Sequence, residues 1–281
     1  MNHSWQAIKQ KLRGTQQTRE NDGFLYYNIT GRQLSLLILL VAATITAGIF
    51  GTQQLALHAA ASDKSLPIYS VETEDQQKRI SLGINCAWGS SDMPALLDVL
   101  DDAEVKATFF FVGSFVDRYP DVVEEIYERG HELANHSDTH ADLTTLDAAG
   151  IEAEIEGCSD KIEAITGERP TLFRCPSGAY NNLAVDTARD LGYEVIQWSV
   201  DSLDWKSLTL PEMEERILPN LTYGDILLFH SGTDYTAAAL PTLIDEIEAM
   251  GYSFVPVGEL IYPDSENIDV TGRQFAPDSA F

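Results

Sequence analysis

The sequence predicts an α/β domain built on a parallel sheet. From residue 79 to residue 257, short apolar segments alternate with amphipathic segments of helical spacing. About seven such units in fewer than roughly 190 residues favour a small closed or nearly closed (β/α) barrel. An apolar stretch nearer the N-terminus, Leu34 to Phe50, predicts one transmembrane helix ahead of this barrel.

The N-terminal region has the pattern of a membrane anchor. No Lys, Arg, Asp or Glu occurs from Gln33 to Ser62, and the apolar stretch is long enough for a bilayer, which needs roughly 17–25 residues. Residues 1–33 carry five basic and two acidic side chains, so we expect them in the cytoplasm and the following domain outside the cell. A cleaved signal peptide is the alternative, with small residues at Ala56–Ala61 as the cleavage point, although an n-region of about 32 residues is long for one. A buried core helix is a weaker alternative, because it would normally show a polar face.

The chain therefore divides into five predicted segments. These are a cytoplasmic segment 1–33, a transmembrane signal anchor 34–54, a linker 55–77, the α/β domain 78–262 and a mobile acidic tail 263–281.

Strands are expected where apolar, β-branched and aromatic residues run between turn residues. The expected strands are 79–85, 106–113, 131–136, 171–176, 193–200, 225–230 and 252–257. Helices are expected where apolar residues recur every three or four positions. The expected helices are 93–103, 121–130, 144–167, 181–192, 210–218 and 240–251. Gly130 stops the second of these helices, and Asn181 or Asn182 caps the fourth.

Residues able to do chemistry fall at the carboxyl ends of the expected strands. They are Asn85, Cys86, His136, His140, Arg174, Asp201, Asp204 and His230. Because the carboxyl ends of parallel strands meet at one rim of a barrel, we expect these side chains to converge there.

Composition limits the classes of partner and of fold. The formal net charge is −26, although the first 33 residues are basic, so the following domain is strongly acidic. This charge argues against nucleic acid and against adhesion to anionic lipid as partners. The three cysteines, Cys86, Cys158 and Cys175, are too few for a disulfide framework, and their odd number leaves at least one without an internal partner.

His136 and His140 form a candidate metal site. Their i, i+4 spacing on a helical turn would let both imidazoles reach one ion, and Ser137 or Thr139 between them would fix a ring. Histidines in a polar loop would show the same spacing without a metal. His230, at the end of an apolar strand, fits either a general acid or a structural histidine.

Four motifs occur together in this chain: His136-x-x-x-His140, the Arg-Cys-Pro-Ser-Gly run from Arg174, Asp204-Trp205, and His230 after an apolar strand. With this set the chain resembles the polysaccharide deacetylases that share the NodB homology domain, carbohydrate esterase family 4. The resemblance covers Ile80 to Ile261 and is greatest to membrane-anchored, sporulation-type members of Firmicutes.

The resemblance implies a NodB-type distorted (β/α) barrel and a role for each residue of these motifs. His136 and His140 would bind one divalent metal ion, most often zinc. Arg174 would orient a catalytic aspartate, and the Ser177 N–H would bind the oxyanion.

The resemblance also implies how the leaving group is handled. His230 would be the acid, supported by the Asp204 carboxylate. Trp205 would form the wall of the acetyl pocket, and we add Trp88 to the residues expected to line the substrate pocket.

The first motif of the family is altered here. Two aspartates usually stand there, one as base and one as metal ligand, but this chain has Asn85 and Cys86. An asparagine cannot take a proton from water, and three hypotheses follow.

In the first hypothesis the domain works by a modified route, with the Cys86 thiolate completing the metal site. Asp92, Asp201 or Asp204 would then act as base. The second is a pseudoenzyme that binds wall glycan. The third is a disulfide between Cys86 and Cys175 that closes the site.

The expected activity is metal-dependent removal of N-acetyl groups from amino sugars of peptidoglycan or a chitin-like wall polymer. Its partner is the acetylated wall polysaccharide, and its place is the outer side of the cell membrane. The alternative is the glycan-binding pseudoenzyme.

Overall fold

A computed structural model describes residues 34, 35, 39, 64–263 and 265–279, and the chain divides into two units, Met1–Asp63 and Lys64–Phe281. Of the first unit, only Leu34, Ser35 and Leu39 are described, all as helix, so most of the predicted anchor 34–54 lies outside the described residues. In the part of the chain that is described, no helix has the length and apolarity needed to cross a membrane.

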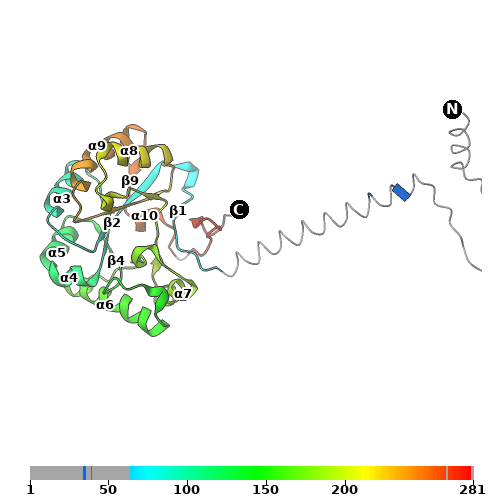
Figure 1. Ribbon diagram of the computed structural model, residues 1–281, viewed down its shortest axis with the longest axis horizontal. Coiled ribbons are helices and arrows are strands. Elements are labelled where there is room, and N and C mark those ends of the chain that lie inside the picture. The colour runs from blue at the N-terminus through cyan, green and yellow to red at the C-terminus, as the bar shows by residue number, and fades with distance from the viewer. Residues whose placement is uncertain (1–33, 36–38, 40–63, 264, 280–281) are drawn as a thin grey trace, which may run out of the picture. The chain divides into compact units, whose positions relative to one another are not determined.

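The second unit is built round a parallel sheet with helices outside it (Figure 1). In spatial order its strands are β6 (Glu194–Val195), β5 (Leu172–Phe173), β4 (Glu132–Asn135), β3 (Thr108–Phe111), β2 (Arg79–Cys86), β8 (Ile226–His230) and β7 (Val200–Asp201), while β9 (Ser253–Phe254) pairs with the start of β2. The predicted parallel α/β architecture is confirmed, as a curled half-barrel whose edge strands β6 and β7 are not paired with each other.

The helices follow the strands much as the amphipathic segments predicted. They are α3 (Met93–Asp102), α4 (Gly113–Arg118), α5 (Pro120–Glu128), α6 (Ala148–Thr166), α7 (Asn182–Asp190), α8 (Leu210–Ile217), α9 (Thr236–Ala249) and α10 (Val257–Leu260). The Asn181 side chain caps α7 by accepting a hydrogen bond from the Ala184 amide. Gly130 has φ +76° two residues beyond α5, a conformation that glycine adopts without a steric penalty.

The two faces of β2 contact different parts of the domain. Ile80, Leu82, Ile84 and Cys86 belong to one buried apolar cluster with residues of α3 and α9. The opposite face includes Gly83, where a Cβ would lie 2.8 Å from a guanidinium nitrogen of Arg174. A side chain at this position would therefore displace the arginine that the site uses.

The predicted linker and tail need correction, because residues on both sides of the expected domain are packed into the second unit. Ile68 bridges Ile196 at the β6 edge, and β1 (Ser70–Val71) pairs in parallel with β10 (Arg273–Gln274). Gln274 is fully buried. The folded domain therefore begins before residue 78 and continues past residue 262.

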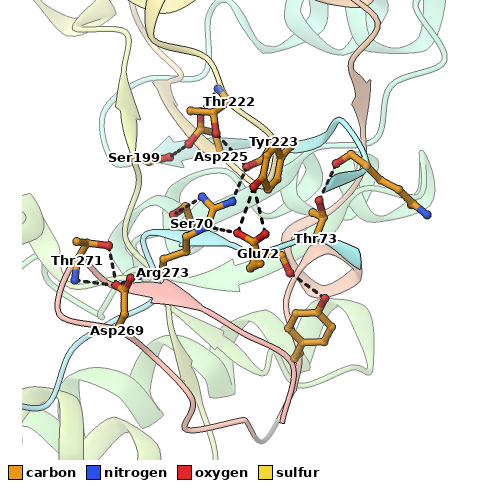
Figure 2. Close-up of polar contacts among 12 residues, drawn as sticks. Ser70, Glu72, Thr73, Ser199, Thr222, Tyr223, Asp225, Asp269, Thr271 and Arg273 are labelled. Atoms are coloured by element: carbon orange, nitrogen blue, oxygen red, sulfur yellow. Dashed lines mark hydrogen bonds and ion pairs between the residues drawn. The ribbon is translucent and has the colours of Figure 1, made fainter. Parts of the chain in front are cut away.

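A polar cluster joins the two ends of the domain (Figure 2). Glu72 accepts from Arg273 Nε at 2.8 Å and from the Tyr223 hydroxyl at 3.1 Å. The Arg273 guanidinium lies 4.9 Å from the centre of the Tyr223 ring and donates to the Tyr223 carbonyl at 3.2 Å. The sequence offered no periodicity for this segment, since its order depends on contacts with residues about 200 positions away.

The expected strand 193–200 is also corrected. It divides into β6 and β7, which lie at opposite edges of the sheet. The chain crosses from one edge to the other between them, and Trp198 in this crossing lines the pocket described next. An apolar run cannot show by itself that it serves two edges of a sheet.

Candidate active site

A cavity of about 340 Å³ opens at the carboxyl ends of the strands. Its lining residues come from six segments that follow or end strands: Asn85, Ala87, Trp88, His136, His140, Ser177, Trp198, Asp201, Trp205, Leu228 and His230. The convergence expected from the strand ends is therefore observed for every predicted site residue except Cys86, Arg174 and Asp204, and the last two lie directly behind the lining.

Arg174 is fully buried below Asn85. Its Nη1 donates to Asn85 Oδ1 at 2.9 Å and its Nη2 to the Gln197 carbonyl at 3.1 Å, while Nε has no hydrogen-bond partner. The guanidinium carbon lies 3.7 Å from the centre of the Phe110 ring.

The charge of Arg174 is not balanced by a carboxylate. Its pKa falls to about 9, with burial as the cause, and among the described residues it forms no ion pair. Behind the pocket lining thus lies an arginine suited to orient a carboxylate, and its partner in the lining is the neutral amide of Asn85.

His136 and His140 both line the cavity, and their rings are arranged edge to face, with ring centres 5.0 Å apart and an angle of 77° between the planes. His136 Nδ1 lies 2.7 Å from the Arg174 carbonyl oxygen, so Nδ1 carries the proton and Nε2 keeps its lone pair. This arrangement is typical of metal-binding histidines. Burial, followed by the effect of His140, lowers the pKa of His136 well below its usual value, which keeps the ring neutral.

These two histidines suit a divalent metal, but as two ligands only. Within residues 64–263 and 265–279, no three His, Cys, Asp or Glu side chains are grouped so as to hold a metal. Two imidazoles supply two coordination positions, and structural and catalytic zinc sites usually have three or four protein ligands.

Asn135 and Glu154, which sequence reasoning missed, help to hold the histidine loop in place. Asn135 Oδ1 accepts from the Ser137 amide at 2.7 Å, and the Ser137 hydroxyl accepts from the His140 amide at 3.0 Å. Glu154 on α6 accepts from the amide and the hydroxyl of Thr139. A glutamate in an amphipathic helix gives no sequence signal of this role.

His230 and Asp204 form a buried pair. Asp204 Oδ1 lies 2.8 Å from His230 Nδ1, and Oδ2 accepts from the His230 amide at 2.7 Å and from the Thr236 hydroxyl at 2.7 Å. The Trp205 amide donates to Oδ1 at 2.8 Å. These contacts fix the ring orientation and leave His230 Nε2 for the pocket, which suits proton donation to a leaving group.

The Ser177 turn has a strained backbone. Ser177 has φ 54° and ψ 15°, a left-handed conformation that costs a non-glycine residue about 1 kcal/mol or more. The hydrogen bonds of the turn run from Gly178 and Ala179 to Cys175 and Pro176, so the Ser177 amide takes part in neither. Ser177 lines the pocket, where its N–H suits a developing oxyanion.

The position of Cys86 contradicts the hypothesis that its thiolate is a metal ligand. Successive side chains of a strand point to opposite faces, so Cys86 follows Asn85 but faces the apolar layer under the helices. Burial raises the pKa of its thiol to about 12, and Cys86 is not among the residues that line the pocket. All three cysteines are free, and Cys86 and Cys175 belong to different core clusters, which contradicts the disulfide.

The three candidate bases also differ in position. Asp92 lies outside the pocket lining, where its Oδ1 accepts from the Gly232 amide at 2.7 Å. Both carboxylate oxygens of Asp204 are hydrogen-bonded, to His230, Thr236 and the Trp205 amide. In the described part of the chain, Asp201 is therefore the one carboxylate that lines the cavity, with Oδ1 accepting from the Leu203 amide at 2.9 Å.

Comparison with known proteins supports the family that the motifs of the site indicated. The family model for polysaccharide deacetylases matches residues 72–196. A peptidoglycan N-acetylglucosamine deacetylase of Bacillus cereus is 31% identical over 195 residues, which are 68% of this chain and 91% of that protein. The chain belongs to the polysaccharide deacetylase family. As a family member it is related to a peptidoglycan N-acetylglucosamine deacetylase, PgdA of Listeria monocytogenes, with 35% identity over 196 residues.

The solved structures of the family include a pseudoenzyme. A pseudoenzyme of carbohydrate esterase family 4 from Bacillus anthracis superposes with a TM-score of 0.67 and 31% identity, over 74% of this chain and 72% of that one. A mutant of that pseudoenzyme with restored enzymatic activity superposes with a TM-score of 0.66. The matched region is 41% of the Listeria deacetylase and 60% of YlxY of Bacillus subtilis, so the chain spans less than two thirds of each of these relatives.

Proposed function

We propose that this polysaccharide deacetylase domain binds N-acetylated amino sugars of a cell-wall glycan, peptidoglycan or a chitin-like polymer, and that Asn85 keeps its turnover low or absent. The observation that supports this most strongly is the contact between Arg174 and Asn85. The site has an acid pair, a candidate oxyanion donor and two metal-binding imidazoles, but no proton acceptor beside Arg174.

The residues of the site divide the work of an amide hydrolysis between them. The Ser177 amide would bind the carbonyl oxygen, and His230 would give a proton to the departing amine. His136 and His140 would hold a divalent metal, zinc by our proposal, which when bound polarises the acetamide carbonyl. The step that is left without a residue is removal of a proton from the attacking water.

Relatives support the choice of ligand. The Bacillus cereus and Listeria proteins are deacetylases of peptidoglycan N-acetylglucosamine, and a Bacillus subtilis relative, PdaA, of peptidoglycan N-acetylmuramic acid. Our proposal includes the sequence expectation that residues 34–54 anchor the domain outside the cell membrane.

The test is glycan binding together with acetate release. The purified full-length protein should bind acetylated chito-oligosaccharide or peptidoglycan fragments by calorimetry, and His230→Ala should bind them with similar affinity. The wild type should release acetate at or near the background rate. Absence of binding to any acetylated glycan would overturn the proposal.

A second candidate function is slow deacetylation with Asp201 as base, because Asp201 lines the cavity. In that case the wild type would release acetate above background, and Asp201→Asn would abolish the release. Equal rates in the two proteins would rule this route out.

A further inference from the structure

One face of α6 lies directly against the loop that carries the two cavity histidines. Glu154, Gly157 and Lys161 follow one another at i, i+3 and i+7, a spacing that places them on one face of the helix. A Cβ on Gly157 would lie 3.3 Å from Cγ of Asp138, so the loop approaches this face closely. The three α6 residues are not part of the cavity lining, and they act on the loop from outside it.

Two side chains of this face bind adjacent residues of the loop. Glu154 accepts from the Thr139 amide at 2.9 Å and from the Thr139 hydroxyl at 2.6 Å. Lys161 donates to Asp138 at 2.6 Å and to Asp117 of α4 at 2.7 Å. Both contacts therefore fall on the interval between the two histidines and not on the histidines themselves.

The loop needs such contacts, because its backbone is strained. Ser137 and His140 have φ of 69° and 63°, a left-handed conformation that is unfavourable for residues other than glycine. His140 directly follows Thr139, so the hydrogen bonds from Glu154 act on the strained segment. Without them the backbone would relax, and the His140 ring would leave the place where its centre is 5.0 Å from that of His136.

We propose that Glu154 is a positioning residue for the metal: it fixes the two imidazoles relative to each other and thereby raises the affinity of the site for zinc. Both of its carboxylate oxygens are bonded to Thr139, so it acts without contacting the ion. Because two imidazoles supply only two ligands, affinity depends strongly on how well they are fixed before the metal binds. The inference rests on the proposed function, which places a divalent metal on His136 and His140.

The test is the zinc affinity of the metal-free, full-length protein, measured by competition with a chromophoric chelator. The wild type should bind one zinc ion, and His136→Ala should lose this binding. Glu154→Ala should bind zinc at least about tenfold more weakly than the wild type. Glu154→Gln keeps one acceptor oxygen and should recover part of the loss.

Glu152→Ala is the matched control, since Glu152 is an exposed glutamate of the same helix and its removal changes the net charge equally. It should leave the zinc affinity within about twofold of the wild type. The melting temperature of metal-free Glu154→Ala should fall by no more than about 4 °C, as expected for the loss of a partly exposed contact.

Three results would overturn the inference alone. They are equal zinc affinity of Glu154→Ala and the wild type, equal weakening by Glu154→Ala and Glu152→Ala, and weaker binding together with a larger fall in melting temperature. Absence of zinc binding by the wild type would overturn the inference and the metal of the proposed function. Glycan binding, measured separately, decides the rest of that function.

Discussion

The buried arginine gives a prediction that does not depend on activity. Arg174 donates to a neutral oxygen of Asn85 at 2.9 Å, and no carboxylate of the described residues pairs with it. Asn85→Asp replaces this acceptor by an isosteric charged one. Hydrogen bonds to charged groups contribute about 1.5–3 kcal/mol, against about 0.5–1.5 kcal/mol for neutral ones. The Arg174 charge is already buried, so we expect a net stabilisation of about 1–2 kcal/mol after the cost of burying the new carboxylate.

For a domain of this size, about 1–2 kcal/mol corresponds to a rise in Tm of roughly 2–8 °C. Arg174 holds the pKa of the introduced carboxylate below its unfolded value. The gain is therefore complete above about pH 4, the unfolded value, and is lost as the pH falls through the folded value. Melting curves of wild type and Asn85→Asp at pH 7 and pH 3 measure this difference.

Asn85→Leu is the control, because it removes the acceptor at similar size. It should destabilise the domain by about 1–3 kcal/mol, as it leaves a donor of a buried cation unpaired. Two results would refute the view that Arg174 lacks a carboxylate partner. One is a Tm of Asn85→Asp below that of the wild type at pH 7, and the other is a gain in Tm that is as large at pH 3 as at pH 7.

Three further predictions concern stability. His131 is buried and its ring accepts a hydrogen bond from the Ala107 amide. Burial is the main cause that lowers its pKa to about 4. Between pH 6.5 and 4 the unfolded chain therefore binds more protons than the folded chain. The wild type should lose about 2–3 kcal/mol of urea-measured stability as the pH falls through this window, and His131→Phe should lose less; equal losses would refute this. Asp204→Ala removes the acceptor of four hydrogen bonds and should cost about 3–5 kcal/mol in the same assay, whereas a cost below about 1 kcal/mol would contradict a buried pair. A double-mutant cycle of Glu72→Ala and Arg273→Ala should give a coupling of about 0.5–1 kcal/mol, and no coupling would mean that this contact does not join the ends of the domain.

Strand-end chemistry was the most predictable part of the site. His136, Asp201 and His230 reach one cavity because parallel strands bring their carboxyl ends together. Cys86 was not predictable in the same way, since adjacent residues of a strand face opposite sides and only the register decides which side is the core. Glu154 and Thr236 act through contacts that depend on tertiary packing.

The fold was predictable where the periodicity is local. The strand β2 and the helix α3 lie within a residue of the expected bounds. The pairing of β1 with β10 joins segments about 200 residues apart and is only two residues long, so it leaves no pattern in the sequence. Short bridging elements of this kind are fixed by packing and not by propensity.

The strain of the backbone is concentrated at the site. Seven non-glycine residues of the described chain have positive φ, and five of them, Ser137, His140, Ser177, Leu203 and Ser207, lie in the loops after β4, β5 and β7 around the cavity. Such strain is retained where a surrounding structure holds it for binding or catalysis. This distribution supports a site that still has a use despite Asn85.

The most direct measurement of the central claim is acetate release from acetylated chito-oligosaccharide by Asn85→Asp beside the wild type, with zinc added to both. We predict release by the variant at least about 100-fold above the wild type, because a base is restored beside Arg174, and loss of that release in the double variant with His230→Ala. Substantial release by the wild type that Asn85→Asp does not increase would contradict the claim that position 85 limits turnover.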